Sequence, residues 1–196
     1  MTLPNKLTLL RIFLVPVMII IYYIPWLKNN YVFLSVSWLY LIEFIIFALA
    51  SFTDFLDGYI ARKYNLITTF GKFADPLADK MLVFSAMTIF LLDNSGVLPV
   101  GPLIPLWVYV VMILREFIVS GIRMVAAGKG EVIAAGKLGK WKTFITMIAI
   151  CILFFSGCHV SIIYIGQIAI YIAAILTIAS GIEYFWNSRK IIFESI

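Results

Sequence analysis

The chain of 196 residues is 63% hydrophobic and 13% charged, with a net charge of +5 and a mean hydropathy of +1.06. A soluble domain carries about 25% charged residues, so these values exclude a soluble globular enzyme, a disordered chain and a nucleic-acid-binding module with a basic surface. A transmembrane helix needs about 20 mostly apolar residues. The length therefore allows roughly six spans with short connections, and it predicts an all-α, polytopic membrane protein with one integral membrane domain over residues 1–196.

Six apolar runs follow one another along the chain, and each is long enough to cross a bilayer. They cover about residues 7–24, 31–61, 73–92, 106–127, 134–155 and 161–186. Short stretches of polar and turn-forming residues separate the runs. Because the runs are long and do not alternate in polarity, they predict helices and not strands.

The lysines and arginines gather on one side of this predicted topology. With six spans, both chain ends and the connections at about 62–72 and 128–140 share a side, and that side holds most of the cations. The opposite connections hold only Lys28. Cytoplasmic loops of membrane proteins are enriched in Lys and Arg. The bias therefore predicts a multi-pass protein of the cell membrane with both termini in the cytoplasm.

Four of the ten acidic residues fall between positions 54 and 79, at the end of the second run and the start of the third. Asp54 and Asp57 are three residues apart. Asp75 and Asp79 are four apart, so each pair shares one face of its helix. A short connection makes the two helices antiparallel neighbours, whose acidic faces can converge. Converging carboxylates repel one another in a poorly solvated site, and one or two divalent cations such as Mg²⁺ or Mn²⁺ would neutralise them.

Small residues and one cation accompany these acids. Gly58 follows the second aspartate directly, Ala61 lies one helical turn further, and Gly71 precedes the third aspartate by one turn. Because glycine costs stability inside a helix, its presence on the acidic faces indicates close approach of a ligand. Arg62 is placed to meet a phosphate. The alternative, solvated helix ends with loop glycines, fits poorly because an acid near a helix C-terminus is electrostatically unfavourable.

The stretch DFLDGYIARKYNLITTFGKFADPLADK reads D-x-x-D-G-x-x-A-R, then eight residues, then G-x-x-x-D-x-x-x-D. It resembles the signature of the CDP-alcohol phosphotransferase family at every defining position. Members of that family cleave the pyrophosphate of a CDP-linked alcohol, release CMP and join the remaining phosphate to an acceptor hydroxyl. The resemblance therefore implies a membrane-bound transferase with the helical bundle of that family, and it favours a homodimer.

The resemblance also implies a role for each signature residue. Two divalent ions, Mg²⁺ or Mn²⁺, would be held by Asp54, Asp57, Asp75 and Asp79. Asp79 would also act as the general base on the acceptor hydroxyl. The pocket for CMP and the diphosphate would be lined by Asp54, Asp57, Gly58, Ala61, Arg62 and Gly71.

The N-terminal run opens with three polar residues, Asn5, Thr8 and Arg11, on one broad arc of a helix. Such residues can serve as a helix cap and an interfacial anchor, or they can contact substrate. The order P-N-x-L-T-x-x-R is similar to the opening of the branch of the family that makes phosphatidylglycerophosphate. This similarity implies that Asn5 and Thr8 border the nucleotide and belong to the CDP pocket.

Charged residues interrupt the fourth run and open the fifth. Arg115, Glu116 and Arg123 lie within an apolar helix, where charges usually face the bundle interior. Together with the lysines that follow, they predict a basic pocket for an anionic acceptor beside the metal site. The residues predicted to bind the acceptor phosphate are Arg115, Arg123, Lys137 and Lys140. Two plainer interpretations are an internal Glu–Arg pair that locks two helices, and lysines that snorkel to the interface.

The patterns R-E-x(6)-R and G-K-x-G-K-x-K-T also resemble the branch that makes phosphatidylglycerophosphate. They imply transfer of the phosphatidyl group from CDP-diacylglycerol to sn-glycerol 3-phosphate in phospholipid biosynthesis, with membrane lipid as the surroundings. One alternative stays within the family and uses serine, an inositol phosphate or phosphatidylglycerol as acceptor. An alternative of another class is a cation transporter that uses the buried aspartates. Release of CMP would separate the two classes.

Overall fold

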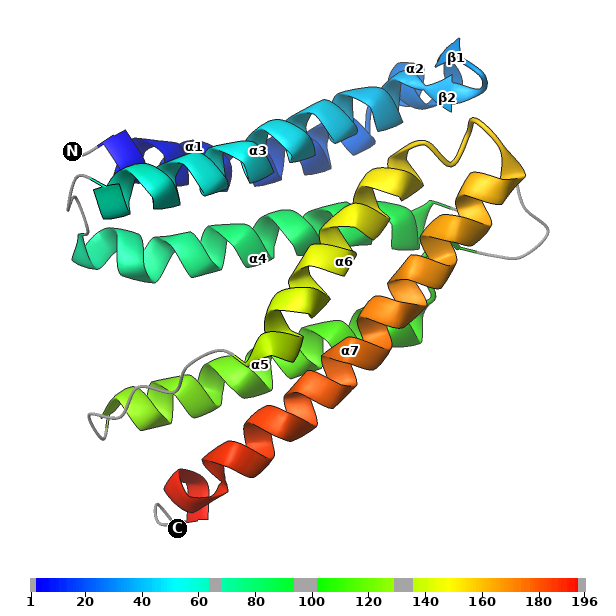
Figure 1. Ribbon diagram of the computed structural model, residues 1–196. Coiled ribbons are helices and arrows are strands. Elements are labelled where there is room, and N and C mark those ends of the chain that lie inside the picture. The colour runs from blue at the N-terminus through cyan, green and yellow to red at the C-terminus, as the bar shows by residue number, and fades with distance from the viewer. Residues whose placement is uncertain (1–2, 64–67, 94–101, 129–135, 194–196) are drawn as a thin grey trace.

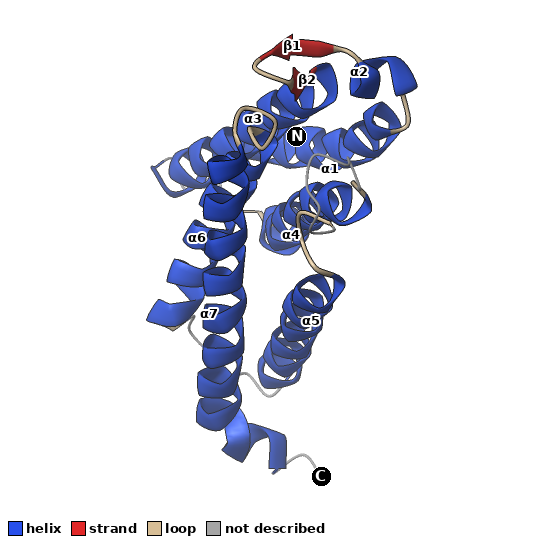
Figure 2. Ribbon diagram, turned by 90° about the vertical axis from the view of Figure 1, so that its right-hand side faces the viewer, coloured by secondary structure: helices blue, strands red, loops and turns tan. Residues whose placement is uncertain are grey.

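A computed structural model describes residues 3–63, 68–93, 102–128 and 136–193 (Figure 1). This part of the chain is almost entirely helical, and the prediction of an all-α fold is confirmed for it (Figure 2). The helices are α1 (Leu3–Tyr22), α2 (Pro25–Asn29), α3 (Trp38–Lys63), α4 (Thr69–Leu92), α5 (Leu106–Gly128), α6 (Lys137–Phe154) and α7 (Val160–Phe193). Each long helix corresponds to one apolar run of the sequence.

Between α2 and α3 the chain forms an antiparallel hairpin of β1 (Tyr31–Phe33) and β2 (Val36–Ser37). The prediction that the second run begins as a helix at about residue 31 is therefore wrong. Aromatic and β-branched residues in β1 favour extended backbone. Leu34 and Ser35 both take positive φ, 43° and 62°, which reverses the chain between the strands. Hydropathy alone does not separate such a hairpin from the start of a helix.

The long helices form two groups. In one group α1 packs along both α3 and α4, and in the other α7 packs along α5 and α6 (Figure 1). Narrower contacts of α3 and α4 with α6, and of α4 with α5, join the groups. Aromatic side chains fill one of these joints, where the rings of Phe90 and Phe154 lie 4.8 Å apart and Phe47 packs against Phe154. All three are fully buried, so this aromatic core fixes α6 against α3 and α4.

Glycines allow close approach around the turn that connects α6 to α7. A Cβ atom on Gly157 would lie 2.3 Å from the carbonyl oxygen of Ser35, so the β-hairpin rests directly on this turn. A Cβ atom on Gly166 would lie 2.5 Å from Cδ2 of the buried Leu153, which brings α6 and α7 close together. The two glycines thus determine how the hairpin and the two C-terminal helices fit.

A buried carboxylate, Asp93, ties three elements together at the end of α4. The hydroxyl of Tyr40 on α3 donates a hydrogen bond to it, and the Nζ atom of Lys28 on α2 lies 3.2 Å from Oδ1. Burial by itself lowers the pKa of Lys28, but the charge and hydrogen bond of Asp93, together with Tyr22, raise it above its usual value. The three-way contact fixes the end of the bundle opposite the chain termini.

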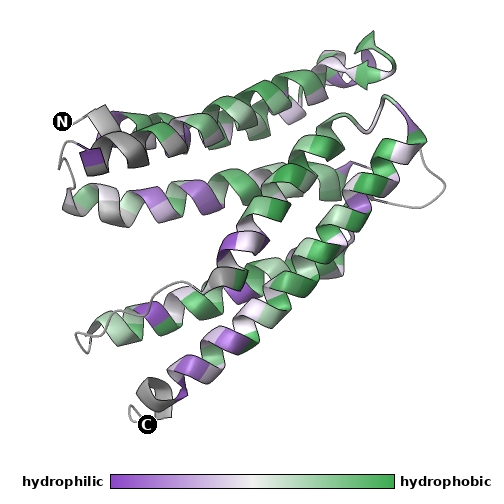
Figure 3. Cartoon of the chain, in the orientation of Figure 1, coloured by the Kyte–Doolittle hydropathy of each residue, from purple (hydrophilic) through white to green (hydrophobic). Residues whose placement is uncertain are grey.

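Two helices of the described chain are long and apolar enough to cross a membrane, namely α1 over Asn5–Tyr22 and α7 over Val160–Arg189. Large apolar side chains are exposed along the bundle, as expected for surfaces that face lipid. The hydrophilic residues concentrate toward the end that holds both termini (Figure 3). The helices α3, α4, α5 and α6 each carry several charged residues, and their crossing of the bilayer stays a prediction.

Candidate active site

The polar face of α1 contacts the aspartates of both neighbouring helices. Thr8 Oγ1 donates a hydrogen bond to Asp75 Oδ1 on α4 at 2.5 Å, and Arg11 Nη1 donates to Asp54 Oδ1 on α3 at 2.6 Å. The Arg11 side chain is fully buried, whereas that of Asp54 is 38% exposed. A buried guanidinium needs such a partner, so the Arg11–Asp54 pair fixes α1 against the acidic end of α3.

The start of α4 brings a second set of predicted residues together. Thr68 caps the helix, because its Oγ1 accepts a hydrogen bond from the Gly71 amide at 3.0 Å. The same hydroxyl donates to Asn5 Oδ1 at 2.8 Å. A Cβ atom on Gly71 would lie 3.2 Å from Thr68 Oγ1, 3.4 Å from Asn5 Oδ1 and 3.5 Å from Asp75 Oδ2. Asn5, Thr8, Gly71 and Asp75 therefore form one contiguous polar corner.

Asp79 lies one turn further along the same face of α4 and is half-buried. The charges of Asp54 and Arg11, and those of Glu116 and Lys142, all act on its carboxylate. It lines a small cavity of about 70 Å³ with Glu116, Lys142 and other residues of α4, α5 and α6. The predicted base thus lies between the polar corner at α1 and the charged residues of the second helix group.

The predicted metal ligands are only partly described. Among the described side chains, no group of three or more Asp, Glu, His or Cys residues is arranged to hold a metal ion. Five predicted site residues have side chains outside the described set: Asp57, Gly58, Ala61, Arg62 and Lys137. The described donors at this end of α3 and α4 are the carboxylates of Asp54, Asp75 and Asp79. Carboxylate oxygens are the ligands that Mg²⁺ and Mn²⁺ prefer, so the chemistry of this donor set fits a divalent ion.

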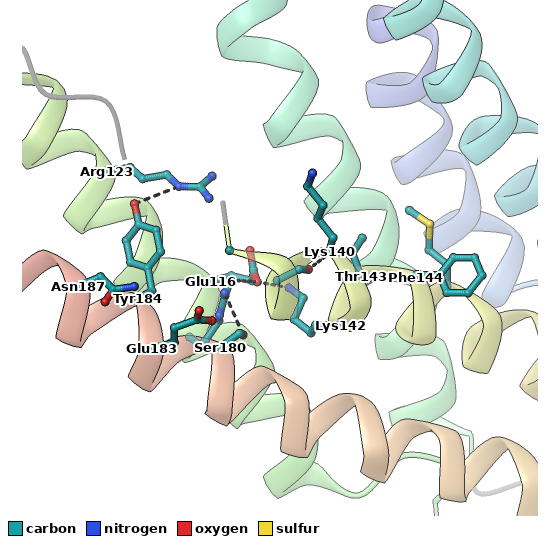
Figure 4. A pocket seen from close by; sticks show the side chains of 14 residues that line it. Glu116, Arg123, Lys140, Lys142, Thr143, Phe144, Ser180, Glu183, Tyr184 and Asn187 are labelled. Carbon is teal, nitrogen blue, oxygen red and sulfur yellow. Dashed lines mark hydrogen bonds and ion pairs between the residues drawn. The ribbon is translucent and has the colours of Figure 1, made fainter. Parts of the chain in front are cut away.

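A larger cavity of about 550 Å³ lies among α5, α6 and α7 (Figure 4). Three of the residues predicted to bind the acceptor phosphate line it, namely Arg115, Arg123 and Lys140. Arg123 Nε donates a hydrogen bond to the Tyr184 hydroxyl at 3.3 Å, and its guanidinium lies 5.5 Å from the centre of that ring. Lys140 is exposed. The cavity therefore presents cations from α5 and α6 to any molecule inside it.

Glu116 is the hub of the charges between the two cavities. Its Oε1 accepts hydrogen bonds from Arg115 Nη1 at 2.8 Å and from Lys142 Nζ, and its Oε2 lies 3.5 Å from Lys80 Nζ. Arg115 is further held by Ser180, to which Nη2 donates at 3.1 Å. Glu116, Lys142 and Thr143 line both the large and the small cavity. We call these three residues the shared wall.

Helix α7 supplies cavity residues that the sequence analysis missed. Ser180, Glu183, Tyr184 and Asn187 all line the large cavity. They are spaced i, i+3, i+4 and i+7, which places them on one face of a helix. In the sequence, this polar stripe near the end of the last apolar run is the pattern that could have predicted these cavity residues.

Comparisons with known proteins show the family of this chain. The family model of CDP-alcohol phosphatidyltransferases matches residues 1–179. The chain belongs to this family. The resemblance stated from the sequence signature is thereby confirmed, and the chain is a transferase of the CDP-alcohol phosphatidyltransferase type. Family membership and the two membrane-spanning candidates α1 and α7 make it a membrane protein.

Several relatives of this CDP-alcohol phosphatidyltransferase are similar over nearly their whole length. The CDP-diacylglycerol–glycerol-3-phosphate 3-phosphatidyltransferase of Bacillus subtilis is 42% identical over 195 residues, covering 96% of this chain and 97% of the relative. The protein of the same name from Rickettsia typhi is 43% identical over 186 residues, covering 93% and 94%. That of Salmonella choleraesuis is 33% identical over 191 residues, covering 95% and 94%.

Proposed function

We propose that this enzyme transfers the phosphatidyl group of CDP-diacylglycerol to sn-glycerol 3-phosphate, giving phosphatidylglycerophosphate and CMP. The observation that carries the proposal is the shared wall of Glu116, Lys142 and Thr143, because these residues line both a cation-lined cavity and the neighbouring cavity at Asp79. An anionic acceptor held in the first can present a hydroxyl to the second. The names of the relatives support the same substrates.

The donor end of the site is assigned to α1, α3 and α4. Asn5, Thr8 and Gly71 border the CMP moiety, together with the α3 residues Asp54, Asp57, Gly58, Ala61 and Arg62. The four aspartates Asp54, Asp57, Asp75 and Asp79 would hold two divalent ions. Ions bound there supply positive charge that neutralises the diphosphate and favours departure of CMP. In this assignment two residues of α1 orient carboxylates of the neighbouring helices: Thr8 orients Asp75, and Arg11 orients Asp54.

The reaction then needs a base and an anchored acceptor. Asp79 takes the proton from the C1 hydroxyl of glycerol 3-phosphate. That oxygen attacks the β-phosphorus, a P–O bond to it forms, and the P–O bond to CMP breaks. Arg115, Arg123, Lys137 and Lys140 hold the acceptor phosphate through charge-assisted hydrogen bonds. Because donor and acceptor bind to different helix groups, both can be present when the hydroxyl attacks.

The proposal includes how the enzyme sits in the membrane. We infer one catalytic domain over residues 1–196, with six spans in the cell membrane and the site open to the cytoplasm. The hydrophilic end of the bundle, which holds the aspartates and both termini, supports this orientation (Figure 3). The acyl chains of the donor then remain in the bilayer while its head group enters the site. A homodimer remains part of the proposal through the family resemblance.

The test is CMP release by the purified enzyme in mixed micelles of detergent and CDP-diacylglycerol. We expect release with sn-glycerol 3-phosphate and Mg²⁺ or Mn²⁺, and loss of release after chelation. Serine, inositol 1-phosphate and phosphatidylglycerol are the comparison acceptors. Release supported by serine alone would overturn the acceptor and leave the family chemistry intact. The cation-transporter alternative predicts no CMP with any acceptor, and membership of a transferase family does not favour it.

A further inference from the structure

Glu183 is a carboxylate in a cavity lined by Arg115, Arg123 and Lys140. Within the described part of the chain, it makes no hydrogen bond and no ion pair. It differs in this from Glu116, the other carboxylate of the cavity, which contacts three cations. Figure 4 shows Glu183 on α7 beside Ser180 and Tyr184. Its acceptor oxygens are therefore available to a ligand.

The contacts of the nearby arginines are with residues other than Glu183. Arg115 donates hydrogen bonds to Glu116 and Ser180. Its side chain also packs against two glycines, since a Cβ atom on Gly139 or Gly181 would lie 3.8 or 3.2 Å from it. Arg123 is bonded to Tyr184 and lies over its ring. Both guanidinium groups are thus held by contacts that do not include Glu183, and the negative charge of Glu183 faces the cavity uncompensated by them.

The Glu183 carboxylate lies against the start of α6. A Cβ atom on Gly136 would lie 3.1 Å from Oε2 and 3.5 Å from Oε1. Gly136 is the N-cap of α6, directly before the lysines assigned to the acceptor phosphate. The carboxylate therefore lies next to the backbone segment that precedes Lys137 and Lys140, and a methyl group at position 136 would press on the carboxylate.

The Glu183 side chain is exposed, and its carboxylate weakens the binding of a plain anion because like charges repel. It favours a ligand that also carries a hydroxyl, because an ionised carboxylate is a hydrogen-bond acceptor only. Hydrogen bonds to a charged acceptor are also stronger than neutral ones. Glycerol 3-phosphate has a phosphate at one end, the reacting hydroxyl at the other, and a free hydroxyl on C2 between them.

We propose that Glu183 is a specificity-determining residue that accepts a hydrogen bond from the C2 hydroxyl of the acceptor. This inference rests on the proposed function, and it deepens it by assigning the selection of a polyol phosphate to α7. The cations of α5 and α6 hold the phosphate, and Glu183 distinguishes acceptors that carry a vicinal hydroxyl from those that do not.

The test compares two acceptors with the same phosphate and the same primary hydroxyl: sn-glycerol 3-phosphate and 3-hydroxypropyl phosphate, which lacks the C2 hydroxyl. For the unmodified enzyme we expect kcat/KM to favour glycerol 3-phosphate by about 10- to 100-fold. In Glu183→Ala the preference should fall to within about threefold. The KM for 3-hydroxypropyl phosphate should also fall, because a repelling charge is gone. Glu183→Gln, which keeps an acceptor oxygen, should be intermediate.

A second pair of variants moves the carboxylate without removing it. Gly136→Ala should reduce the preference between the two acceptors because the added methyl displaces Glu183. Gly121→Ala is the matched control, since a Cβ atom there has no atom within 4 Å, and the preference should not change. The elution volume on size exclusion and the thermal midpoint show whether each variant is folded.

The outcomes separate the two claims. If the unmodified enzyme releases no CMP with either acceptor, the proposed function fails. If it uses both but does not distinguish them, or if Glu183→Ala and Gly136→Ala distinguish them as well as the unmodified enzyme does, the role of Glu183 is overturned and the proposed function stands. A loss of activity toward both acceptors in equal proportion also overturns the role, because it indicates a structural effect.

Discussion

At the scale of single residues, the proposed chemistry depends on Asp79, which lies between the polar corner at α1 and the shared wall. Replacement by Asn removes the basic oxygen and keeps the shape of the side chain. We expect Asp79→Asn to lower kcat by about 10²- to 10⁴-fold while binding of CDP-diacylglycerol is partly retained. CMP release and binding of the labelled lipid measure the two effects. A variant with a near-normal kcat would show that Asp79 is not the base.

Glu116 offers a test of stability at the same scale. It contacts Lys80, Arg115 and Lys142, and the Glu116 and Lys142 side chains are only 15% and 11% exposed. Removing the charge leaves buried cations without their partner, so Glu116→Gln should lower the free energy of unfolding by about 3 kcal/mol. Lys80→Met breaks the longest, most exposed of these pairs together with the Lys80 hydrogen bond to Ser120, and it should cost only about 1 kcal/mol. Denaturation in detergent measures the free energy of unfolding of both variants. Equal losses in the two variants would contradict the central role of Glu116 among these cations.

The sequence predicts the positions of some site residues better than those of others. The aspartate spacing predicts that Asp75 and Asp79 share one face of a helix, because helical periodicity fixes which side chains lie on the same side. It does not fix how close Asp54 on α3 comes to them, and among the described side chains no three acidic residues are arranged to hold a metal ion. The contacts of Thr8 and Arg11 with Asp75 and Asp54 were not predicted, since a polar arc at a helix start also suits an interfacial anchor or a substrate contact. Whether Asp57 joins them lies outside the described side chains.

At the scale of elements, close backbone contacts decide the fit. Gly157 meets the carbonyl oxygen of Ser35, which is backbone and cannot rotate away. Gly157→Ala should therefore shift the hairpin from the α6–α7 turn and lower the free energy of unfolding by about 1–3 kcal/mol. Gly121→Ala adds the same methyl group in open space inside α5, so it should not lower the free energy of unfolding and should raise it by up to about 1 kcal/mol. Thermal unfolding of the two variants provides the comparison, and equal midpoints would contradict the contact.

The contact of α2 with the end of α4 predicts a dependence on pH. The pKa of Lys28 is raised above its usual 10.5 in the folded chain. A raised pKa means that the ion pair with Asp93 stabilises the fold fully below about pH 10.5 and loses its effect as the pH rises through the raised value. We expect the difference in thermal midpoint between the unmodified enzyme and Lys28→Met to persist at neutral pH and to shrink in alkali. A difference that disappears near neutral pH would contradict this.

Elements also show where sequence patterns reach their limit. The six apolar runs correspond to the long helices because each contains enough apolar residues for a helix and ends at turn formers. The hairpin at residues 31–37 was not predicted, since Tyr31-Val32-Phe33 is as apolar as a helix start. The polar stripe of α7 was overlooked because Ser180 and Tyr184 hardly change the average hydropathy of a long apolar run. Only their spacing reveals a common face.

At the scale of the whole molecule, the topology is open to a direct test. In a background with Cys151 and Cys158 replaced, single cysteines at Lys28 and at Lys140 lie at opposite ends of the predicted spans. A membrane-impermeant maleimide added to intact cells should label Lys28→Cys, whereas Lys140→Cys should react only after the cells are opened. These two positions are separated by three predicted spans, so labelling of both in intact cells would contradict the six-span orientation.

In the proposed reaction, one helix group binds the donor and the other binds the acceptor. The polar corner and the Arg11–Asp54 pair lie on α1, α3 and α4, and the cation-lined cavity lies on α5, α6 and α7. Composition alone predicted a membrane bundle but not this division, because the pairing of long helices depends on side-chain packing that hydropathy does not encode. The aromatic core of Phe47, Phe90 and Phe154 provides such a joint between the groups.

The shared wall has a consequence for inhibitor chemistry. It separates a chamber of about 550 Å³ from one of about 70 Å³, and both are lined by Glu116, Lys142 and Thr143. A water-soluble compound with an anionic body and a slender hydroxylated arm would fill the first chamber and extend into the second. Such a compound would compete with the aqueous substrate and not with the lipid, so the abundance of phospholipid around the enzyme would not reduce its potency.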